Sequence, residues 1–412
     1  MLRFNTTTSL LEIYNDATLA WQPLSPGVVS AAGSAASPAV TLSTDTDTGI
    51  YWSAANELAI TTGGTQRVRI RDSAMLIPVG TTAQRPASPV NGEMRYNTSI
   101  GAPEFYNSTA AEWQFPAVMA NVGSGTNTLR AIFGYGTTGS NVSMTNLVSS
   151  SGIVATDTTG VGTARYGLAA AGYGGDKAIF GYGWNGSSNF SMTNLVSNAG
   201  VVATDVTGVG TARRALAAAG YGGDKSIFAY GFTSSAVSMK NLVNNAGTVA
   251  ADVTGVGTAR YGLAAAGYGG DKSIFAYGFT SSVVSMKNLV DNAGVVAADV
   301  TGVGTARTDL AAAGYGGDKA IFGYGNNGSV VVSMTNLVSN LGVVAADVTG
   351  VGTARTELAA AVYGGDKAIF GYGTTGSNVS MTNLVSNLGV VAADVTGVGT
   401  ARRTLAAAGY ST

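Results

Sequence analysis

The residue types that most enzymes use for catalysis are largely missing from this chain of 412 residues. It has no Cys, which excludes disulfides, thiolate nucleophiles and Cys-based zinc sites, and no His, the usual general base and commonest metal ligand. Asp309 and Glu357 occupy corresponding positions of neighbouring repeats and form the one variable acidic pair that polysaccharide cleavage could use. We therefore predict no cofactor, no bound metal and no enzymatic activity.

Two other charged patterns have structural explanations. Asp45-Thr-Asp47-Thr-Gly49 resembles part of a calcium loop, but it lacks the third acidic ligand and the bidentate Glu, so we interpret it as a turn. Six Asp residues each precede an Arg by eight positions, and a catalytic site would break such a symmetry. We assign the six pairs to the scaffold, where they cap turns or join strands: Asp157–Arg165, Asp205–Arg213, Asp252–Arg260, Asp299–Arg307, Asp347–Arg355 and Asp394–Arg402.

The overall composition favours packed strands joined by tight turns. Apolar residues make up 45 % of the chain, charged residues only 11 %, and Gly contributes 59 residues. The net charge of −1 gives no electrostatic attraction to nucleic acid or to an anionic membrane. Because there is no signal-peptide pattern and no apolar run of about 18 residues, we expect a soluble protein that is made in a cytoplasm.

Internal repeats dominate the last two thirds of the sequence. The string Gly-Thr-Ala-Arg recurs with its Arg at positions 165, 213, 260, 307, 355 and 402, at spacings of 47 or 48 residues. A period of this length fits propeller blades of four short strands. In the repeat around Gly364, the expected strands are 358–362, 367–372, 379–385 and 390–395, and none has helical periodicity.

The two ends of the repeat region indicate how the repeats close on one another. The first repeat starts directly at a second strand, residues 129–133, and the last ends with an unpartnered inner strand, residues 404–410. We predict that these two segments pair, which leaves no open sheet edge and argues against a linear solenoid. The small residues Ala-Ala-Ala in each first strand suit the crowded centre of such a ring.

The string Arg-x-x-Leu-Ala-Ala-Ala-Gly, followed by Asp-Lys-Ala-Ile-Phe-Gly-Tyr-Gly, Asn-Leu-Val and Asp-Val-Thr-Gly, resembles the kelch repeat. The resemblance covers residues 125–412, although Gly181-Tyr182-Gly183 replaces the kelch double Gly and the later Tyr and Trp of that motif are absent. It implies a propeller closed by a split blade. A repeat like that of chromosome-condensation regulators would show His-Thr in the inner strand, and a copper-oxidase propeller would need His and Cys ligands.

The N-terminal third contains a different duplication. Arg3-Phe4-Asn5, Glu12-Ile13-Tyr14-Asn15 and Trp21-Gln22 recur as Arg95-Tyr96-Asn97, Glu104-Phe105-Tyr106-Asn107 and Trp113-Gln114, each offset by 92 residues, and each copy is expected to form a hairpin. Asp-Thr-Gly-Ile-Tyr at 47–51, Gly-Gly-x-x-Arg at 63–67 and Arg-Pro-x-x-Pro-x-x-Gly-x-x-Arg-Tyr-Asn at 85–97 resemble phage tail-fibre and appendage modules. That resemblance implies a structural virion protein, expected to be a homotrimer.

We therefore predict an all-β chain with an N-terminal hairpin and linker (1–37), a β stem module (38–83), a second hairpin module (84–124) and a six-bladed kelch-like β-propeller closed by its C-terminal strand (125–412). The predicted function is that of a non-enzymatic virion appendage, a tail or head fibre. Its N-terminal region would bind other virion proteins, and its propeller a host surface glycan, a receptor or another virion protein. A purely structural decoration or spacer is the alternative. No nucleic-acid partner and no membrane insertion are expected.

Differences among the repeats point to one candidate binding face. Two sets of positions vary: the pair after each repeat Arg, and the loop between the second and third strands. In an up-and-down blade both emerge on the same face, and aromatic and Arg side chains are typical anchors there; drift in surface loops is the competing explanation. The candidate residues are Tyr166, Trp184, Asn185, Phe190, Arg214, Phe232, Tyr261, Phe279, Asp309, Asn326, Glu357 and Arg403.

Overall fold

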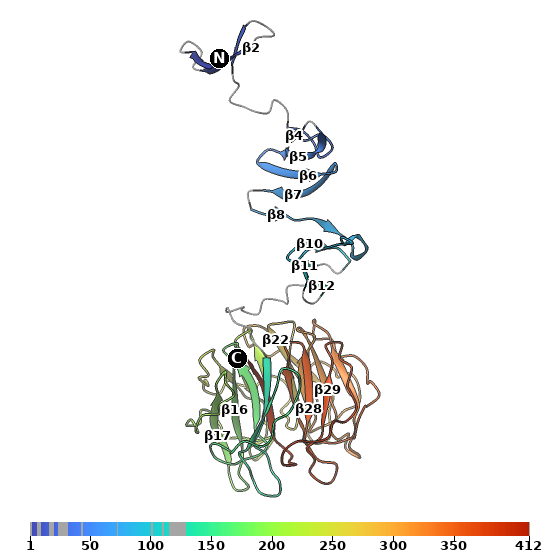
Figure 1. The fold of residues 1–412 in the computed structure, drawn as a ribbon. Helices are drawn as coiled ribbons and strands as arrows, with labels where there is room; N and C mark the ends of the chain where they lie inside the picture. Colours follow the sequence, from blue (N-terminus) through green and yellow to red (C-terminus); the bar gives the residue numbers. More distant parts are fainter. Residues whose placement is uncertain are drawn as a thin grey trace. The chain divides into compact units, whose positions relative to one another are not determined.

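The protein is all-β, as the sequence predicts. The computed structural model describes residues 2–5, 10–15, 20–23, 32–42, 44–71, 73–99, 102–108, 111–114 and 129–411, in which strands are joined by turns and one short 3-10 helix, η1 (Thr82–Gln84) (Figure 1). The chain divides into two compact units, residues 1–117 and 118–412. Among the described residues, no helix is long and apolar enough to cross a membrane.

The first unit contains three antiparallel or mixed sheets that follow one another along the chain. The first is β1 (Leu2–Asn5), β2 (Leu10–Asn15) and β3 (Ala20–Pro23). The second is β4 (Val40–Leu42), β5 (Asp45–Ala54), β6 (Glu57–Thr62), β7 (Thr65–Ile70) and β8 (Met75–Leu76). The third has the order β12-β11-β10-β9, with β9 (Val79–Gly80), β10 (Met94–Asn97), β11 (Ala102–Asn107) and β12 (Glu112–Gln114).

The duplicated sequence forms the same pairing twice. Arg3 lies opposite Glu12 in β1 and β2, and Arg95 lies opposite Glu104 in β10 and β11. The next strand pair repeats the register too, because Tyr14 faces Trp21 and Tyr106 faces Trp113. The predicted hairpin is therefore confirmed in both copies, each extended by a third strand.

In the second copy, the repeated charged residues are structural. Glu104 is 1 % exposed and accepts hydrogen bonds from Arg85 and Asn97, with Arg85 Nη2 at 2.6 Å from Oε2. The bond from Arg85 holds the pKa of Glu104 below its usual value, against the effect of its burial. Arg95 lies 3.6 Å from the same carboxylate. The Arg-Tyr-Asn motif thus builds a small polar core.

The second unit is built from six three-stranded antiparallel repeat sheets. We number them along the chain: sheet 1 is β30-β13-β14, sheet 2 β15-β16-β17, sheet 3 β18-β19-β20, sheet 4 β21-β22-β23, sheet 5 β24-β25-β26 and sheet 6 β27-β28-β29. The inner strands are β30 (Ala406–Ser411), β15 (Ala169–Tyr173), β18 (Ala217–Tyr221), β21 (Ala264–Tyr268), β24 (Ala311–Tyr315) and β27 (Ala359–Tyr363). The middle strands are β13 (Leu129–Gly134), β16 (Lys177–Trp184), β19 (Lys225–Ala229), β22 (Lys272–Ala276), β25 (Lys319–Gly323) and β28 (Lys367–Gly371). The outer strands are β14 (Thr145–Val148), β17 (Asn189–Val196), β20 (Lys240–Val243), β23 (Lys287–Val290), β26 (Thr335–Val338) and β29 (Thr382–Val385).

The predicted pairing between the two ends of the repeat region is confirmed. Strand β30 pairs antiparallel with β13, with Leu129 opposite Ser411 and Gly134 opposite Ala406. Each inner strand contacts the inner strands of two neighbouring sheets, in the order β15, β18, β21, β24, β27, β30 and back to β15. Sheet 1 is therefore assembled from the first and last described strands of the unit.

Apolar cores lie between neighbouring sheets. Between sheets 2 and 3, Ile179 and Tyr182 pack with Leu216, Phe228 and partners from both sheets, and corresponding clusters join the other five pairs, including sheets 6 and 1. The middle strands are almost wholly buried because they face a neighbour on each side. The glycines of these strands admit an aromatic ring: a Cβ at Gly134 would lie 2.8 Å from Phe180 Cζ. Packing against the Phe180 ring therefore explains why position 134 is Gly.

The fourth strand of each repeat was expected as a continuous element and is not one. In its place, two isolated bridges hold each outermost segment, as Val385–Val391 and Thr382–Val395 do in sheet 6. The residues between the two bridges, Ala392 to Asp394, are exposed. The Asn383 side-chain amide donates a hydrogen bond to the Ala392 carbonyl at 3.0 Å. Side-chain hydrogen bonds thus replace part of the strand ladder.

Candidate ligand-binding face

The two variable sets of residues are direct neighbours in the structure. In every repeat sheet, the residue after the repeat Arg forms a β-bridge with the first residue of the loop between the middle and outer strands. The bridges are Arg403–Thr137, Tyr166–Trp184, Arg214–Phe232, Tyr261–Phe279, Thr308–Asn326 and Thr356–Thr374. From this bridge, the chain continues into the inner strand of the same sheet. In sheets 2 to 6, a Gly-Gly-Asp turn follows the far end of that strand. We call the bridge end of the sheets the loop face and the opposite end the turn face.

Sheets 2, 3 and 4 give the loop face an arc of stacked side chains. The Arg214 guanidinium carbon lies 4.2 Å from the ring centre of Trp184 and 5.1 Å from that of Phe232. The Tyr261 ring continues the stack at 5.1 Å from Phe232 and 5.5 Å from Phe279. All five side chains are half-buried. They form a wall in which each ring or guanidinium supports the next.

The loop of sheet 2 is shorter than the sequence indicates. Trp184 ends β16 and Phe190 lies in β17, where it is paired with Gly183, so the connecting residues are 185–188. Asn185 orders this turn, because its Oδ1 accepts hydrogen bonds from the backbone amides of Ser187 and Ser188 at 2.9 and 2.8 Å. Phe190 is half-buried in the strand and does not join the stack described above. It therefore contributes to the loop face through packing.

Sheets 5, 6 and 1 present polar residues at the equivalent positions. Asn326 and Thr308 are bridge partners in sheet 5, and Thr rather than an aromatic ring occupies both bridge positions in sheet 6. Arg403, the exposed bridge residue of sheet 1, places Nη1 3.2 Å from Glu357 Oε2. One half of the loop face is therefore aromatic and the other half polar.

A ring of backbone hydrogen bonds closes the centre of the loop face. It is made by the second residue after each repeat Arg, and each N–H donates to the carbonyl of its equivalent in the preceding sheet at 2.7–2.9 Å. The donor–acceptor pairs are Gly167–Thr404, Ala215–Gly167, Gly262–Ala215, Asp309–Gly262, Glu357–Asp309 and Thr404–Glu357. All six residues have φ between +51° and +62°, although only two are Gly. The other four adopt a backbone that side chains disfavour.

Burial changes the acidity of the two carboxylates on this ring. It raises the pKa of Asp309 to about 7; the nearby Glu357 adds to the shift, and a hydrogen bond involving Thr308 opposes it. Burial also raises the pKa of Glu357, and Arg403 opposes that shift. The structure thus brings the two predicted acids to adjacent ring positions, where Asp309 is protonated in a substantial fraction of molecules at neutral pH.

A depression of about 530 Å³ opens on the loop face where sheets 1, 2 and 6 meet. Four predicted site residues line it: Tyr166, Asn185, Glu357 and Arg403. Six further residues line it that were not chosen as candidates, and all of them except Asn141 belong to the variable segments: Thr137, Gly139, Ser140, Asn141, Gly186 and Thr404. The Asn141 side-chain amide bridges two of these loops by donating to the Asn185 carbonyl at 2.6 Å. Loop variability was the available signal for these residues.

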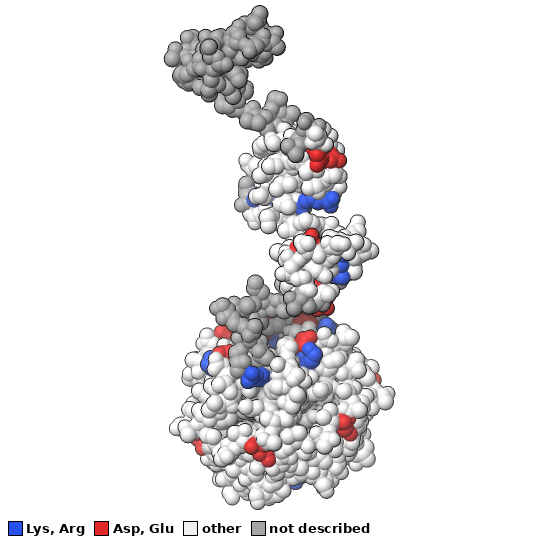
Figure 2. Space-filling model, viewed as in Figure 1, with Lys and Arg blue, Asp and Glu red and all other residues white. Residues whose placement is uncertain are grey.

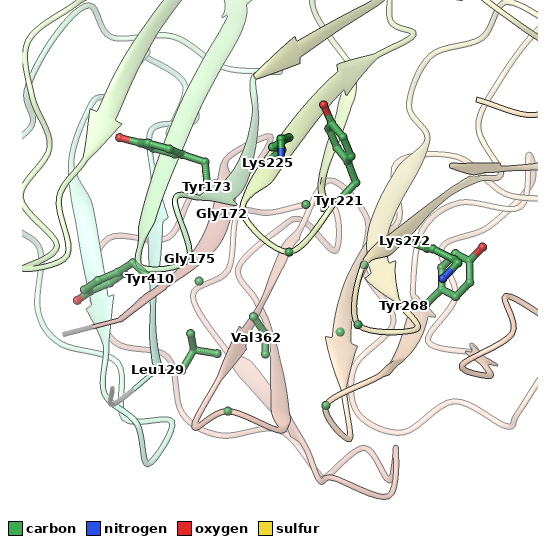
Figure 3. A pocket seen from close by; sticks show the side chains of 18 of the residues that line it. Leu129, Gly172, Tyr173, Gly175, Tyr221, Lys225, Tyr268, Lys272, Val362 and Tyr410 are labelled. Atoms are coloured by element: carbon green, nitrogen blue, oxygen red, sulfur yellow. The ribbon is translucent and has the colours of Figure 1, made fainter. Parts of the chain in front are cut away.

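The turn face has a cavity of its own, of about 320 Å³, on the axis of the inner strands. It is lined by glycines, by Lys residues and by Tyr173 and its equivalents, but Figure 3 shows the labelled tyrosine side chains pointing outward, away from its centre. Each lining Lys has an adjacent acid, as with Lys225 Nζ and Asp224 Oδ1 at 2.8 Å. The cavity is therefore bounded largely by backbone and by internally paired charges.

The repeated Asp and Arg residues do belong to the scaffold, but they pair differently from the sequence-based assignment. Arg165 is fully buried and lies 3.8 Å from Asp205, which belongs to the following repeat, instead of pairing with Asp157 eight residues earlier. Asp157 instead pairs with Arg402 at 3.9 Å. The short sequence separation misled the assignment, because the intervening Thr-Gly-Val-Gly-Thr link carries the Arg into the next sheet.

Each buried Arg joins two sheets. Arg165 donates to the Tyr182 carbonyl at 2.7 Å, to the Thr163 carbonyl at 3.0 Å and to Asn194 Oδ1 at 2.7 Å, and its guanidinium carbon lies 4.5 Å from the ring centre of Tyr135 in sheet 1. Burial lowers the pKa of this guanidinium, which the tyrosine and the aspartate oppose.

Charged residues are otherwise sparse and scattered. Figure 2 shows isolated basic and acidic residues on the visible side of the repeat unit, without a patch of one sign. Residues 45–49 do not form the predicted turn: they begin strand β5, where Asp45 and Asp47 are exposed and the Asp47 carbonyl accepts a hydrogen bond from the Gly64 amide, which pairs this segment with the turn after β6. In the part of the chain that the structure describes, no group of three or more acidic residues could hold a metal ion.

In comparisons with known proteins, no family profile and no curated protein matches the chain.

Proposed function

We propose that residues 125–412 form a six-bladed, kelch-like β-propeller in which each repeat sheet is one blade. The cyclic order of inner-strand contacts, the pairing of β30 with β13 and the ring of hydrogen bonds on the loop face support this proposal. The fully buried Arg402 adds to it, since it contacts the Tyr135 carbonyl and Asn146 Oδ1 across the join of the two chain segments.

On this basis, the protein is a non-enzymatic virion appendage, a tail or head fibre. Its N-terminal region attaches to other virion proteins, and its propeller recognises a glycan or receptor on the host surface, or another virion protein. The observation that carries the recognition role is the segregation of sequence variation: the bridge residues of the loop face differ from sheet to sheet, while the five Gly-Gly-Asp turns of the turn face are identical. A ligand lacks the near six-fold symmetry of the propeller, so a binding face is where the blades should differ.

The recognition role is tested by mutating the aromatic wall. The full-length chain and its Trp184→Ala/Phe232→Ala variant are applied to an array of bacterial surface glycans, with Asp224→Ala on the turn face as the matched control. Loss of such anchors typically costs about 2 kcal/mol, or roughly thirty-fold in affinity. The control should bind as the unaltered chain does. Equal binding by the aromatic variant contradicts recognition through this face.

The alternative, a purely structural spacer, is favoured by one observation. Trp184, Arg214, Phe232 and Tyr261 are stacked on one another and half-buried, so they also contribute to packing. The same array decides between the two functions, because a spacer binds no glycan. Release of oligosaccharide by the full-length chain, abolished in Glu357→Gln or Asp309→Asn, would instead establish an enzyme.

Self-association as a homotrimer is the second part of the proposal, and one face of the β4–β8 sheet fits it. Residues that face each other across the strands form a continuous apolar surface: Val40, Ile50, Trp52, Leu58, Ile60, Val68, Ile70 and Met75. Met75 is 62 % and Ile70 44 % exposed, whereas Tyr51, Ala59 and Thr61 on the other face are buried. A sheet with an uncovered apolar face gains stability from association with identical copies.

Light scattering of the full-length chain tests the oligomer. We expect three times the single-chain mass of 41.2 kDa, and a shift toward one chain in Ile60→Asp, which places a charge in the middle of the apolar face. Val90→Asp alters a residue that is 64 % exposed outside this face and should leave the mass unchanged. A single-chain mass for the unaltered protein refutes the trimer.

A further inference from the structure

We propose that the depression between sheets 1, 2 and 6 is the primary ligand subsite of the loop face, and that it holds a neutral mono- or disaccharide unit. The inference rests on the proposed recognition of a glycan and adds where the sugar binds and what charge it has. The volume of the depression, about 530 Å³, lies in the range of about 300–1,000 Å³ that is usual for small-molecule sites.

The lining residues match the two kinds of surface that a pyranose presents. Tyr166 brings an aromatic ring from the end of the aromatic wall, which suits the apolar C–H face of a sugar. Glu357, Arg403, Asn141 and Asn185 bring carboxylate, guanidinium and amide groups, which suit hydroxyls that both donate and accept hydrogen bonds. The depression therefore lies where the aromatic and polar halves of the loop face adjoin.

The charges in the depression favour a neutral ligand. Arg403 and Glu357 already form an ion pair, with Nη1 and Oε2 at 3.2 Å. An anionic sugar would meet the Glu357 carboxylate and, behind it on the ring, Asp309. A cationic amino sugar would meet the Arg403 guanidinium. A neutral sugar can bridge the pair without leaving either charge unpaired.

Two buried polar atoms in the lining lack a hydrogen bond. Glu357 Oε2 is ion-paired with Arg403 without hydrogen-bond geometry, and Thr404 Oγ1 has no partner either, although both atoms are buried. Buried polar atoms of native proteins are normally satisfied, so an unsatisfied pair at one site requires an explanation. Arg403 is exposed, so its side chain can exchange partners at little cost and admit a hydroxyl to these oxygens.

The backbone below the depression supports the same assignment. Glu357 and Thr404 have φ of +55° and +51°, values that a β-branched Thr rarely adopts. The hydrogen-bond ring holds both residues in this conformation, since the Thr404 amide donates to the Glu357 carbonyl at 2.8 Å. The backbone from which both side chains project is thereby held in place before a ligand arrives, which lowers the ordering cost of binding.

The test uses saturation-transfer NMR and calorimetric titration of the full-length chain with methyl glycosides. The neutral probes are the methyl glycosides of glucose, galactose, mannose and N-acetylglucosamine, and the charged probes are those of glucuronic acid, N-acetylneuraminic acid and glucosamine. We expect at least one neutral glycoside to bind, with an affinity at least ten-fold weaker in Glu357→Gln and in Arg403→Ala. Asp224→Asn, on the turn face, is the matched control, and a cooperative thermal transition well above the temperature of the titration shows that each variant is folded.

The outcomes separate this inference from the proposed function. Binding of the charged probes alone, or neutral binding that is equal in Glu357→Gln and the unaltered chain, overturns the subsite. If no methyl glycoside binds, while the unaltered chain binds the glycan array and the Trp184→Ala/Phe232→Ala variant binds it more weakly, the subsite is wrong and the recognition role stands. If neither experiment detects a sugar, the subsite and the recognition of a glycan are both rejected.

Discussion

The two faces of the repeat unit close in the same way but use different residues. On the turn face, Gly174 N–H donates to the Asp224 carbonyl at 2.7 Å, and the equivalent bonds continue around to Gly364 with Leu129 and Ser411 with Asp176. The five Gly-Gly turns have positive φ at Gly in each case. On the loop face, each amide donates to the preceding sheet instead of the following one, and Ala, Asp, Glu and Thr occupy four of the six positive-φ positions.

This difference indicates what each face is for. Both rings use backbone groups, so neither requires particular side chains to close. The turn face takes the residue that adopts its backbone most easily, as expected for a scaffold. The loop face accepts strained residues and differs from sheet to sheet, a combination that is common at functional sites. Leu129, the first described residue of the repeat unit, lines the turn-face cavity.

The largest expected effect comes from removing the strand that completes both rings. Deletion of residues 403–412 leaves β13 without its partner β30 and removes one member of each ring. Since an inner strand of sheet 1 is lost together with its share of two apolar cores, we expect loss of cooperative unfolding in calorimetry. Addition of a synthetic 403–412 peptide should restore a transition. A deletion variant that unfolds as the full chain does contradicts closure by this strand.

A pair of adjacent arginines separates scaffold from variable face. Arg213 is fully buried and donates to the Tyr230 carbonyl, the Thr211 carbonyl and Asn241, whereas Arg214 is half-buried in the aromatic wall. Arg213→Met removes the hydrogen bonds to those three acceptors and the ion pair with Asp252, and should lower the free energy of unfolding by about 3–5 kcal/mol. Arg214→Met should cost about 1 kcal/mol. Chemical denaturation measures both, and equal losses would remove the distinction.

The acids of the two faces should respond to pH in opposite directions. Burial raises the pKa of Asp309 on the loop face to about 7 from about 3.9 in the unfolded chain, so its contribution to stability is complete below pH 4 and is lost as the pH rises through 7. Asp309→Asn should therefore stabilise the protein above pH 7, on the order of 3 kcal/mol, and have little effect near pH 4.

Asp224 on the turn face provides the control of opposite sign. Its hydrogen bond with Lys225 lowers its pKa, so it contributes stability above pH 4 that is lost as the pH falls through the folded-state value. Asp224→Asn should lose this contribution at neutral pH. Thermal unfolding of the Asp309 variant between pH 4 and 9 and of the Asp224 variant between pH 2 and 5 measures the two slopes, and slopes of the same sign would contradict the assigned environments.

The smallest effect concerns backbone strain within the loop-face ring. Ala215 has φ of +52°, so Ala215→Gly should stabilise the protein by up to about 1 kcal/mol. Gly167→Ala is the reverse change at φ +62°, where the nearest atom to a new Cβ is 3.5 Å away, and it should cost about as much through strain alone. Denaturation midpoints measure the two shifts, and a loss in Ala215→Gly would mean that the ring carries no strain there.

The repeats made much of the fold predictable. The period of 47 or 48 residues, the Gly-Gly-Asp turns and the lone inner strand are local signals, and the observed pairing of β30 with β13 follows from them. The expected fourth strand was wrong, because the local sequence does not show which side chains of a neighbouring strand compete for its backbone hydrogen bonds. The fourth strand is reduced to two bridges because Asn383 and its equivalents take over hydrogen bonds at its centre.

The candidate site was predictable only as a set of variable positions. Repetition identified Tyr166, Trp184 and Glu357 as residues that differ, and chain direction put them on one face. Their contacts depend on residues from adjacent sheets: Arg214 lies between Trp184 and Phe232, and Arg403 reaches Glu357. Periodicity along one chain carries no information about which side chains of adjacent sheets touch.

The sequence by itself determined the all-β class, the repeat boundaries and the absence of His and Cys chemistry, because these depend on composition and on spacing along the chain. Only the tertiary structure decided that Asp205 belongs with Arg165, that Asp309 and Glu357 become adjacent and poorly solvated, and that a depression forms beside them. Burial and charge pairing are properties of space between sheets, and the chain reaches that arrangement only when the first and last strands meet.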